Sequence, residues 1–483
     1  MVTVLGANSV TGGYDVENSL RFNGGSTDFF TTTQTAVTAE RKKFTISCWV
    51  KRSLLTSGNQ TIASAGNGGG SEEFSIFFKS NDTLEVYHHN GSAYEMRLIT
   101  NMLFRDPSAW YNIVFVCDTA NGTAALRQRL FVNGVELTDA NSDFSTYDES
   151  PQNDNLPVNV DERFQIGSAS WGNPGSGLGN GLNLFSGYIA EFYQTAGQAN
   201  IATKFGEFDS DSGIWRPIDV SSLTYGKNGF YLEFKSGGNL GDEDKGTQTA
   251  DWSETNLTAV DQSTDTCTNN FATWNSLINS NGAITEGNLK YTTSNGSSDY
   301  GYRNTTIGVN KGKWYVEIKY TSSSVQGLVG IRSKLATALV HYLGYYADDY
   351  GFYIDGSIYQ NNGDRGDLGA SWGNDDIVGI YLDLDNNKLY FSKNGTLYTA
   401  TGYDITAAAS TTTGNYFFSA SEWNSSGNGA FELNAGNPVS ALDNTAITDD
   451  NGYGAFEYSP NITGDSAAKK FYALNTKNLA EFG

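Results

Sequence analysis

The chain has 483 residues, more than one hydrophobic core normally serves, so two or more domains are expected. Aromatic residues make up 13% of it, and 55 glycines stand against only 7 prolines, which argues against disorder and favours aromatic strands joined by glycine turns. The formal net charge of -23 makes nucleic acid a poor partner, because phosphate binding needs clustered Lys and Arg, and we attribute this charge to solubility.

The N-terminal residues 1–16 carry glycine and asparagine with little periodicity, so we interpret them as an arm that could dock on a neighbour. They lack the basic and apolar regions of a secretory signal. No stretch of the chain approaches the ~20 apolar residues of a membrane span. Cys48, Cys117 and Cys267 have no close spacing, so neither a disulfide framework nor a zinc site is predicted. The first two lie in apolar runs and are expected to be small core residues.

Residues 17–205 have the pattern of a first β module. Residues 44–51 alternate apolar and polar side chains, as in a half-buried strand. A hairpin turn is predicted at Asn133-Gly134, because this pair supplies the positive φ values of a two-residue turn at low steric cost. A glycine-rich loop, residues 171–181, precedes the last strand. The strands expected in this module are residues 44–51, 74–78, 84–88, 94–98, 110–117, 164–168 and 185–193.

Residues 206–270 hold fewer apolar residues, and we interpret them as a connecting segment with some order of its own. A second β module follows over residues 271–435, with a second hairpin signal at Asn394-Gly395. Residues 436–483 form a C-terminal tail with a single strand-like run. The strands expected after residue 205 are 229–234, 313–320, 326–331, 377–384, 389–392 and 471–474. The chain is therefore predicted to be all-β, with two tandem antiparallel β-sandwich domains of the jelly-roll type.

The first module resembles the laminin-G-like, concanavalin-type jelly roll in four motifs that follow one another in order. They are Phe44-Thr-Ile-Ser-Cys-Trp-Val, Trp110-Tyr-Asn-Ile-Val-Phe-Val, Leu130-Phe-Val-Asn-Gly-Val and Phe185-Ser-Gly-Tyr-Ile-Ala-Glu-Phe.

The second module resembles a SPRY domain, which implies recognition of protein partners through loops and no catalysis. The motifs that carry this resemblance are Gly312-Lys-Trp-Tyr-Val-Glu-Ile, Leu328-Val-Gly-Ile, Asp376-Ile-Val-Gly-Ile-Tyr-Leu-Asp and Leu389-Tyr-Phe-Ser-Lys-Asn-Gly. Taken whole, the arm, the two modules and the tail resemble structural proteins of tailed bacteriophages, and this resemblance implies a place in the virion.

No catalytic residue is predicted. Retaining glycosidases need two carboxylates about 5 Å apart, and the nearest pattern, Glu207-Phe-Asp-Ser-Asp, lies in the connecting segment without a second Glu. A nucleophilic triad needs a general base, and only His88, His89 and His341 are available. His88 and His89 are adjacent on an expected strand, so their side chains point to opposite faces. We therefore expect a protein that is not an enzyme.

Three loops combine aromatic residues with amide and carboxylate groups, which together stack on sugar rings or anchor protein partners. Tyr345, Tyr346 and Tyr350 are the best candidates, because so many aromatics in a Gly- and Asp-rich stretch cannot all belong to a core. Packing under a loop is the alternative for each ring. The candidate ligand-binding residues are Trp171, Asn173, Tyr342, Tyr345, Tyr346, Asp348, Asp349, Tyr350, Trp423 and Asn424.

No cofactor is predicted, although calcium is possible. Calcium takes several oxygen ligands from closely spaced Asp and Asn residues. Asn361, Asp364 and Asp367 could supply them, and we see no turn that these residues are required to form. The segment Asp383-Leu-Asp-Asn-Asn has similar residues, but the turn before a hairpin strand accounts for them.

These expectations favour a non-enzymatic surface protein of a phage particle, a tail fibre or similar appendage that recognises host-surface glycans or proteins. The alternative is a capsid-decorating or structural virion protein whose modules bind neighbouring subunits. A polysaccharide-cleaving appendage is the third possibility. The expected partners are other virion proteins and a host surface glycan or protein. Several copies per particle, and hence a homo-oligomer, are expected because multivalency amplifies weak single-site binding.

Overall fold

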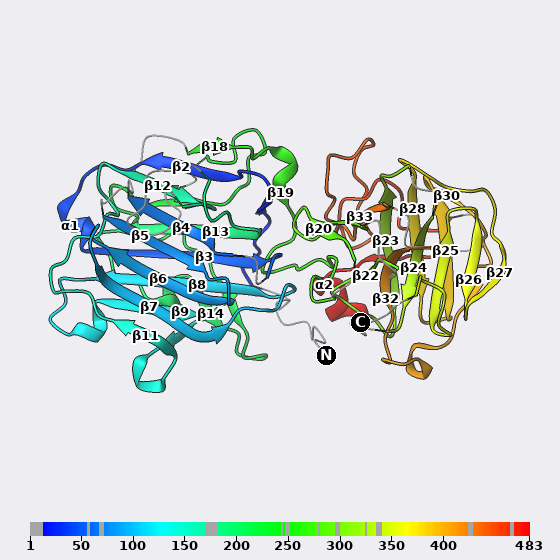
Figure 1. Ribbon diagram of the computed structural model, residues 1–483, viewed down its shortest axis with the longest axis horizontal. Coiled ribbons are helices and arrows are strands. Elements are labelled where there is room, and N and C mark those ends of the chain that lie inside the picture. The colour runs from blue at the N-terminus through cyan, green and yellow to red at the C-terminus, as the bar shows by residue number, and fades with distance from the viewer. Residues whose placement is uncertain are drawn as a thin grey trace. The chain divides into compact units, whose positions relative to one another are not determined.

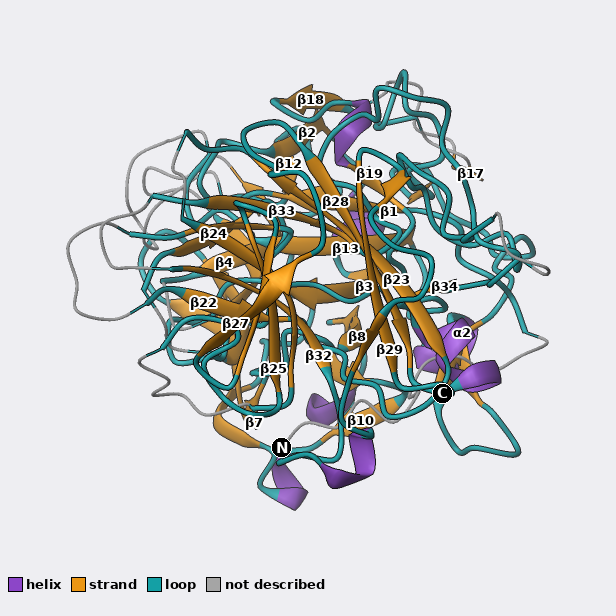
Figure 2. Ribbon diagram, turned by 90° about the vertical axis from the view of Figure 1, so that its right-hand side faces the viewer, coloured by secondary structure: helices purple, strands orange, loops and turns teal. Residues whose placement is uncertain are grey.

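The computed structural model describes residues 13–55, 58–66, 72–169, 181–242, 245–246, 252–278, 281–294, 300–323, 326–334, 341–423, 428–463 and 468–483. The chain divides into two compact units, and the division falls between Thr268 and Asn269. Nearly all regular elements are strands, drawn in orange in Figure 2. The structure therefore confirms the predicted all-β class. Among the described residues, no helix is long and apolar enough to cross a membrane.

The first unit is built from two antiparallel sheets, coloured blue to green in Figure 1. The first sheet has the order β10 (Val135–Leu137), β9 (Gln128–Val132), β8 (Trp110–Asp118), β3 (Lys43–Arg52), β13 (Gly187–Ala196), β1 (Ser19–Phe22) and β19 (Gln262–Ser263), with β16 (Phe230–Leu232) and β17 (Lys245–Gly246) beside β13. The second sheet has the order β11 (Phe144–Asp148), β7 (Tyr94–Leu103), β6 (Thr83–His89), β5 (Glu73–Phe78), β4 (Gln60–Gly66), β12 (Arg163–Ile166), β2 (Phe29–Thr33) and β18 (Ser253–Thr255). A separate hairpin pairs β14 (Gly206–Phe208) with β15 (Trp215–Pro217). The short helices of this unit are α1 (Thr38–Arg41), η1 (Ala124–Leu126), η2 (Asp139–Asn141), η3 (Ala202–Lys204) and η4 (Ala259–Asp261).

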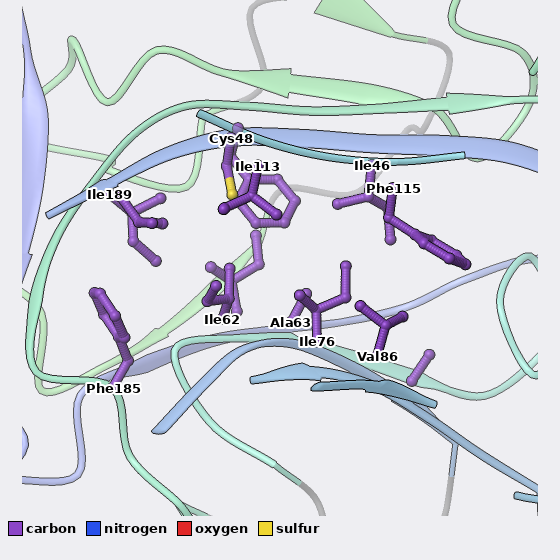
Figure 3. Close-up of a cluster of buried hydrophobic side chains, with 14 of the residues drawn as sticks. Ile46, Cys48, Ile62, Ala63, Ile76, Val86, Ile113, Phe115, Phe185 and Ile189 are labelled. Carbon is purple, nitrogen blue, oxygen red and sulfur yellow. The ribbon is translucent and has the colours of Figure 1, made fainter. Parts of the chain in front are cut away.

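The core of the first unit lies between these two sheets. Every second residue of β3 and β5 points inward, as the alternation of their sequences predicts. Burying one such large apolar side chain stabilises the fold by about 1.5–3 kcal/mol. Figure 3 shows the two facing layers, in which Ile46, Cys48, Ile113, Phe115 and Ile189 lie opposite Ile62, Ala63, Ile76 and Val86. Cys48 and Cys117 are core residues, as predicted.

A third layer of irregular chain covers the outer face of the first sheet. Trp49 and Trp110 lie on this face and are buried by residues 199–225 and by Cys267. The Lys51 ammonium contacts the Asp265 carboxylate at 2.7 Å, and the pair is buried. The predicted connecting segment, residues 206–270, thus adds strands and cover to the first unit. The strand expected at residues 229–234 is present as β16, whereas most other apolar residues of the segment stand singly between polar ones and gave no strand-like run.

The second unit is also a pair of sheets, coloured green to red in Figure 1. The first has the order β20 (Ala283–Thr285), β21 (Lys290–Thr292), β33 (Ala430–Asn434), β23 (Lys313–Tyr320), β28 (Ile377–Asp383), β29 (Lys388–Lys393) and β30 (Thr396–Leu397), with β31 (Tyr403–Asp404) beside β29 and β34 (Tyr472–Ala473) parallel to β23. The other has the order β22 (Tyr302–Asn304), β32 (Phe417–Glu422), β24 (Gly327–Arg332), β25 (Asp349–Tyr353), β26 (Ser357–Gln360) and β27 (Gly363–Asp367). The helices are η5 (Ala408–Ser410) and α2 (Thr476–Phe482).

The C-terminal tail covers the outer face of the sheet that contains β23. Phe456 and Phe471 pack there against Tyr315 and Tyr381. Glu317 holds the tail in place, because its carboxylate accepts hydrogen bonds from the Glu457 and Tyr458 amides at 3.0 and 2.7 Å. The helix α2 was not predicted. It begins after Asn475, whose side chain accepts a hydrogen bond from the Asn478 amide at 2.9 Å and so caps the helix.

Both predicted Asn-Gly hairpin turns are present. Asn133 and Gly134 have φ values of 48° and 77°, and Asn394 and Gly395 have 47° and 76°, so both turns are of type I′. In each, the Asn side chain also accepts a hydrogen bond from a backbone amide of the neighbouring strand, that of Asn112 at 2.7 Å or Ile377 at 2.9 Å. Both turns have a structural role, since their Asn side chains form hydrogen bonds within the sheet.

Candidate binding surface of the second unit

Four aromatic side chains gather on the outer face of the sheet formed by β22, β32 and β24 to β27. Tyr353 ends β25, Tyr359 lies on β26, and Trp423 directly follows β32. In these strands the alternate residues Phe352 and Ile358 point into the core, so the rings of Tyr353 and Tyr359 point outward. Tyr342 reaches the same face from the loop between β24 and β25.

The four rings form one continuous group, which we call the aromatic surface. The Trp423 ring lies 4.1 Å from the Tyr342 ring, 4.5 Å from the Tyr359 ring and 5.2 Å from the Tyr353 ring, measured between centroids. Tyr353, Tyr359 and Trp423 are half-buried, so part of each ring meets solvent. Such a surface can stack on a sugar ring or receive an apolar or cationic side chain.

The loop that carries Tyr342 lies directly on the sheet. The Leu343 amide donates a hydrogen bond to the Ser421 hydroxyl at 2.9 Å, and Gly351 permits this approach, because a Cβ atom there would lie 2.4 Å from the Leu343 carbonyl oxygen. Arg332 fixes the loop from below by donating to the Tyr342 carbonyl oxygen and to Asp349, both at 2.9 Å. The surface is therefore held by a buried polar network.

The hydroxyl group of Tyr342 is used in a hydrogen bond within the protein. It donates a hydrogen bond to the Asn362 side-chain oxygen at 2.7 Å. Burial, together with the hydroxyls of Tyr359, Tyr300 and Tyr345, raises the pKa of Tyr342 to about 12. The Tyr342 hydroxyl therefore stays protonated at neutral pH and acts as a hydrogen-bond donor.

Several predicted site residues lie at the margin of the aromatic surface. Tyr345 stacks on His341 at 3.6 Å between centroids and is 5.8 Å from Tyr342. Tyr346 lies beneath the Lys334 ammonium, 3.6 Å from it. Asp348 accepts hydrogen bonds from the Thr412 amide and hydroxyl at 3.0 and 2.8 Å. Asp348 thus joins two loops.

Asp349 and Tyr350, predicted as exposed ligand-binding residues, are buried, and the structure corrects both. Asp349 pairs with Arg332 in an ion pair of which neither side chain is exposed. Tyr350 belongs to the hydrophobic core, and its hydroxyl accepts a hydrogen bond from the Thr406 amide at 2.8 Å. Strand alternation explains the second correction, since Tyr350 and Phe352 share the inward face of β25. Trp171, Asn173 and Asn424 lie outside the described residues.

The segment predicted as a calcium site has a turn role that the sequence did not reveal. Asn361 and Asn362 form the two-residue turn between β26 and β27, with φ values of 51° and 54°. Asp364 accepts a hydrogen bond from the Gly366 amide at 2.7 Å, and Asp367 accepts one from the Ser357 hydroxyl at 2.9 Å. Within the described ranges, no group of three His, Cys, Asp or Glu could hold a metal ion. Calcium binding by the three predicted residues stays a prediction, which titration calorimetry with CaCl2 can test.

Two further groups that could suggest chemistry have structural roles. Glu207 contacts Arg216 at 2.8 Å, and Asp209 accepts hydrogen bonds from the Asp211 and Ser212 amides, so this acidic segment shapes a turn. His88 and His89 point to opposite faces, as predicted: His88 pairs with Asp154 and His89 packs on Tyr94.

A pocket of about 410 Å³, part of it open solvent, lies between the tail and the outer face of β23. Its lining includes Glu317, Lys319, Glu457 and residues 438–443. Glu457 accepts hydrogen bonds from the Asp443 and Asn444 amides, as Glu317 does from other tail amides. The buried carboxylates of this pocket therefore hold the tail.

Sequence reasoning did not single out Tyr353, which ends the candidate loop of residues 342–353, and it missed Tyr359. Both follow a period-two pattern with core residues, Phe352 and Ile358, so the alternation could have placed them on an outer face. Their convergence with Trp423 depends on the pairing of β24 with both β25 and β32, which no local pattern reveals.

Comparisons with known proteins agree with the fold of the first unit. Residues 23–192 match the family model Laminin_G_3, described as the concanavalin A-like lectin/glucanases superfamily. This match confirms the laminin-G-like, concanavalin-type resemblance of the first module. It covers part of the chain.

A stretch of 91 residues, 19% of this chain, is 37% identical to the ATP-dependent RNA helicase DDX1 of Xenopus laevis. The matched stretch spans 12% of the length of that helicase.

Similar solved structures include two SPRY domains and a pentraxin. The SPRY domain of human HERC1 is 18% identical, with a TM-score of 0.25, over 30% of this chain and 87% of that chain. Another human SPRY domain is 17% identical, with a TM-score of 0.24, over 32% of this chain and 92% of that chain. The native heptameric SAP-like pentraxin of Limulus polyphemus is 16% identical, with a TM-score of 0.28, over 44% of this chain and 100% of that chain.

Proposed function

We propose that this protein is a non-enzymatic binding protein and that the aromatic surface of its second unit contacts a glycan or protein partner. The observation that carries the proposal is the convergence of Tyr342, Tyr353, Tyr359 and Trp423 on one solvent-facing side of a rigid sheet. Partly exposed aromatic groups held on a sheet bind at low entropic cost, since their conformation is set before the ligand arrives.

The lectin-like family match of the first unit supports a binding role for the chain as a whole. We propose further that the chain is a virion surface protein of a tailed bacteriophage, a tail fibre or similar appendage that contacts the host, present as a homo-oligomer. The order of arm, two sandwiches and tail supports this. The alternative, capsid decoration through contacts with neighbouring virion proteins, uses the same surface.

Binding of the full chain to a glycan array and to purified host envelope proteins tests the first proposal. The variant Trp423→Ala removes the central ring of the surface, and Phe208→Ala removes an exposed ring of the first unit as a matched control. We expect Trp423→Ala to reduce binding at least ten-fold and Phe208→Ala to leave it within two-fold, by analogy with aromatic anchors at interfaces. Equal binding by Trp423→Ala and the unaltered chain would show that the aromatic surface is not the binding site.

Labelling of intact phage particles with an antibody to this chain separates the two virion roles. Label at the tail, together with blocked adsorption, supports the appendage. Label over the capsid without an effect on adsorption supports decoration, and particles that contain none of the chain would refute both.

A further inference from the structure

Carboxylates surround one side of the aromatic surface. Asp364 lies directly opposite Tyr359 in the pairing of β26 with β27, so both side chains project from the same face. Asp355 lies in the turn between β25 and β26 and is exposed, as are Asp364 and Asp367. Burial and the charges of Asp364, Asp355 and Asp367 raise the pKa of the Tyr359 hydroxyl.

Two of these carboxylates are fixed and still have an oxygen available. Asp355 accepts the Ser357 amide through Oδ1 at 2.9 Å, and Asp364 accepts the Gly366 amide through Oδ1 at 2.7 Å. The Oδ2 atom of each contacts no hydrogen-bond donor among the described residues. Each turn therefore holds a carboxylate in place with one oxygen free for a partner.

Other rings of the chain have a cation over them, whereas Tyr359 and Trp423 have none among the described residues. Arg97 lies 4.3 Å from the Tyr94 ring centroid, and Lys334 covers Tyr346. No Lys or Arg of the described residues lies over Tyr359 or Trp423. Arg365, the cation of the same hairpin, donates to the Gln360 carbonyl oxygen at 3.1 Å and acts electrostatically on Tyr403.

We infer that the aromatic surface binds a protein segment with an exposed arginine or lysine, whose cation lies over Tyr359 and Trp423 and faces Asp355 and Asp364. This inference rests on the proposed function and specifies the chemistry of the partner. Electron-rich ring faces and the negative charges of the carboxylates both attract a cation. A neutral glycan would stack on the rings and donate hydroxyl hydrogen bonds to the carboxylates, but it would leave their charges without a counter-charge. Charge complementarity therefore favours a basic protein partner over a glycan.

A pair of peptides tests directly whether binding requires the positive charge of the partner. The probes are acetyl-Gly-Arg-Gly-amide and the same peptide with citrulline, which keeps the shape of arginine without its charge. Binding to the full chain labelled with 5-fluorotryptophan is followed by fluorine NMR, and Trp423→Phe identifies the Trp423 signal. At about 0.02 M salt, we expect the affinity of the arginine peptide to be at least ten-fold higher than that of the citrulline peptide. At about 0.5 M salt, this preference should shrink, because salt screens the charges.

Charge variants locate the effect. Asp355→Asn with Asp364→Asn keeps the Oδ1 acceptors of both turns and removes both charges, so we expect the preference for arginine to fall below two-fold. Asp148→Asn with Asp211→Asn makes the same change in net charge at exposed sites of the first unit and should leave the preference intact. Each variant is compared with the unaltered chain at the same ionic strength.

Equal affinity for both peptides, or a preference that survives in Asp355→Asn with Asp364→Asn, overturns the inference. A glycan that shifts the Trp423 signal when neither peptide does would overturn the inference and leave the proposed function standing. Failure of peptides, glycans and host proteins alike to shift the signal would refute both.

Discussion

The indole ring of Trp215 lies so close to Gly134 that a Cβ atom at this glycine would come within 2.2 Å of the ring. Gly134 is the second residue of the first Asn-Gly turn, and Trp215 belongs to the layer that covers the first sheet. The second Asn-Gly turn has the same arrangement, with Tyr458 of the tail 2.6 Å from the Cβ position of Gly395. In both units, an aromatic ring of the covering chain therefore packs against the glycine of an Asn-Gly turn, at the place that a side chain would occupy.

Gly134→Ala should therefore destabilise the first unit by about 2–4 kcal/mol, through steric overlap with Trp215 and a positive φ that disfavours a Cβ atom. Urea denaturation measures the change. Gly213→Ala is the matched control, because Gly213 has a φ of 70° with no atom within 4 Å of its Cβ position. It should cost only about 1–2 kcal/mol, and equal losses in the two variants would show that the Trp215 contact is unimportant.

Glu191 should make the stability of the first unit depend on pH. Its buried carboxylate accepts hydrogen bonds from Tyr193 and, at 2.7 Å, from Tyr231, and burial raises its pKa to about 7 from the ordinary value of 4.5. The folded state therefore binds this proton more tightly than the unfolded state. The resulting stabilisation, about 3 kcal/mol, is fully present below about pH 4.5 and is lost as pH rises to about 7.

Urea denaturation between about pH 4.5 and 8 tests this dependence. Glu191→Gln carries no titrating proton and keeps an oxygen acceptor, so its unfolding free energy should fall less over this range than that of the unaltered chain. Glu149→Gln, at an exposed glutamate, should keep the original slope. An unchanged slope in Glu191→Gln would assign the pH dependence to other groups.

Asp265→Asn should destabilise the first unit by about 3–5 kcal/mol, because it leaves the buried Lys51 ammonium without its carboxylate. Asp265 also accepts the Trp110 indole N–H at 3.2 Å, so it fastens the end of the covering layer to the sheet. Glu136→Gln breaks the half-exposed ion pair with Arg129 and should cost less than about 1 kcal/mol. A loss of similar size in the two variants, measured by thermal and urea unfolding, would contradict this difference.

Local sequence predicted the elements whose conformation is decided within a few residues. The Asn-Gly turns and β3, β8, β23 and β28 were found because turn chemistry and period-two alternation are local signals. The Asn361-Asn362 turn was missed because its flanking strands are short and polar, so it was interpreted as a possible metal site.

The candidate site was only partly predictable. Tyr342 and Trp423 were named, but their contact joins residues about 80 positions apart. Composition placed Tyr350 among the best candidates, ahead of these two residues, although strand alternation buries it. The covering layers were not predictable, since Trp215 packs singly from a short hairpin and Phe456 packs singly from the tail.

The dependence of the second unit on its tail sets a limit on how the chain can be shortened. A fragment that stops after β33 would expose Tyr315 and Tyr381 to water and would take the Glu457 and Tyr458 amides away from Glu317. During synthesis the same face stays open until residues 436–483 have left the ribosome. Truncation near residue 435 is therefore expected to give an aggregating protein, although every strand of the two sheets except β34 would be present.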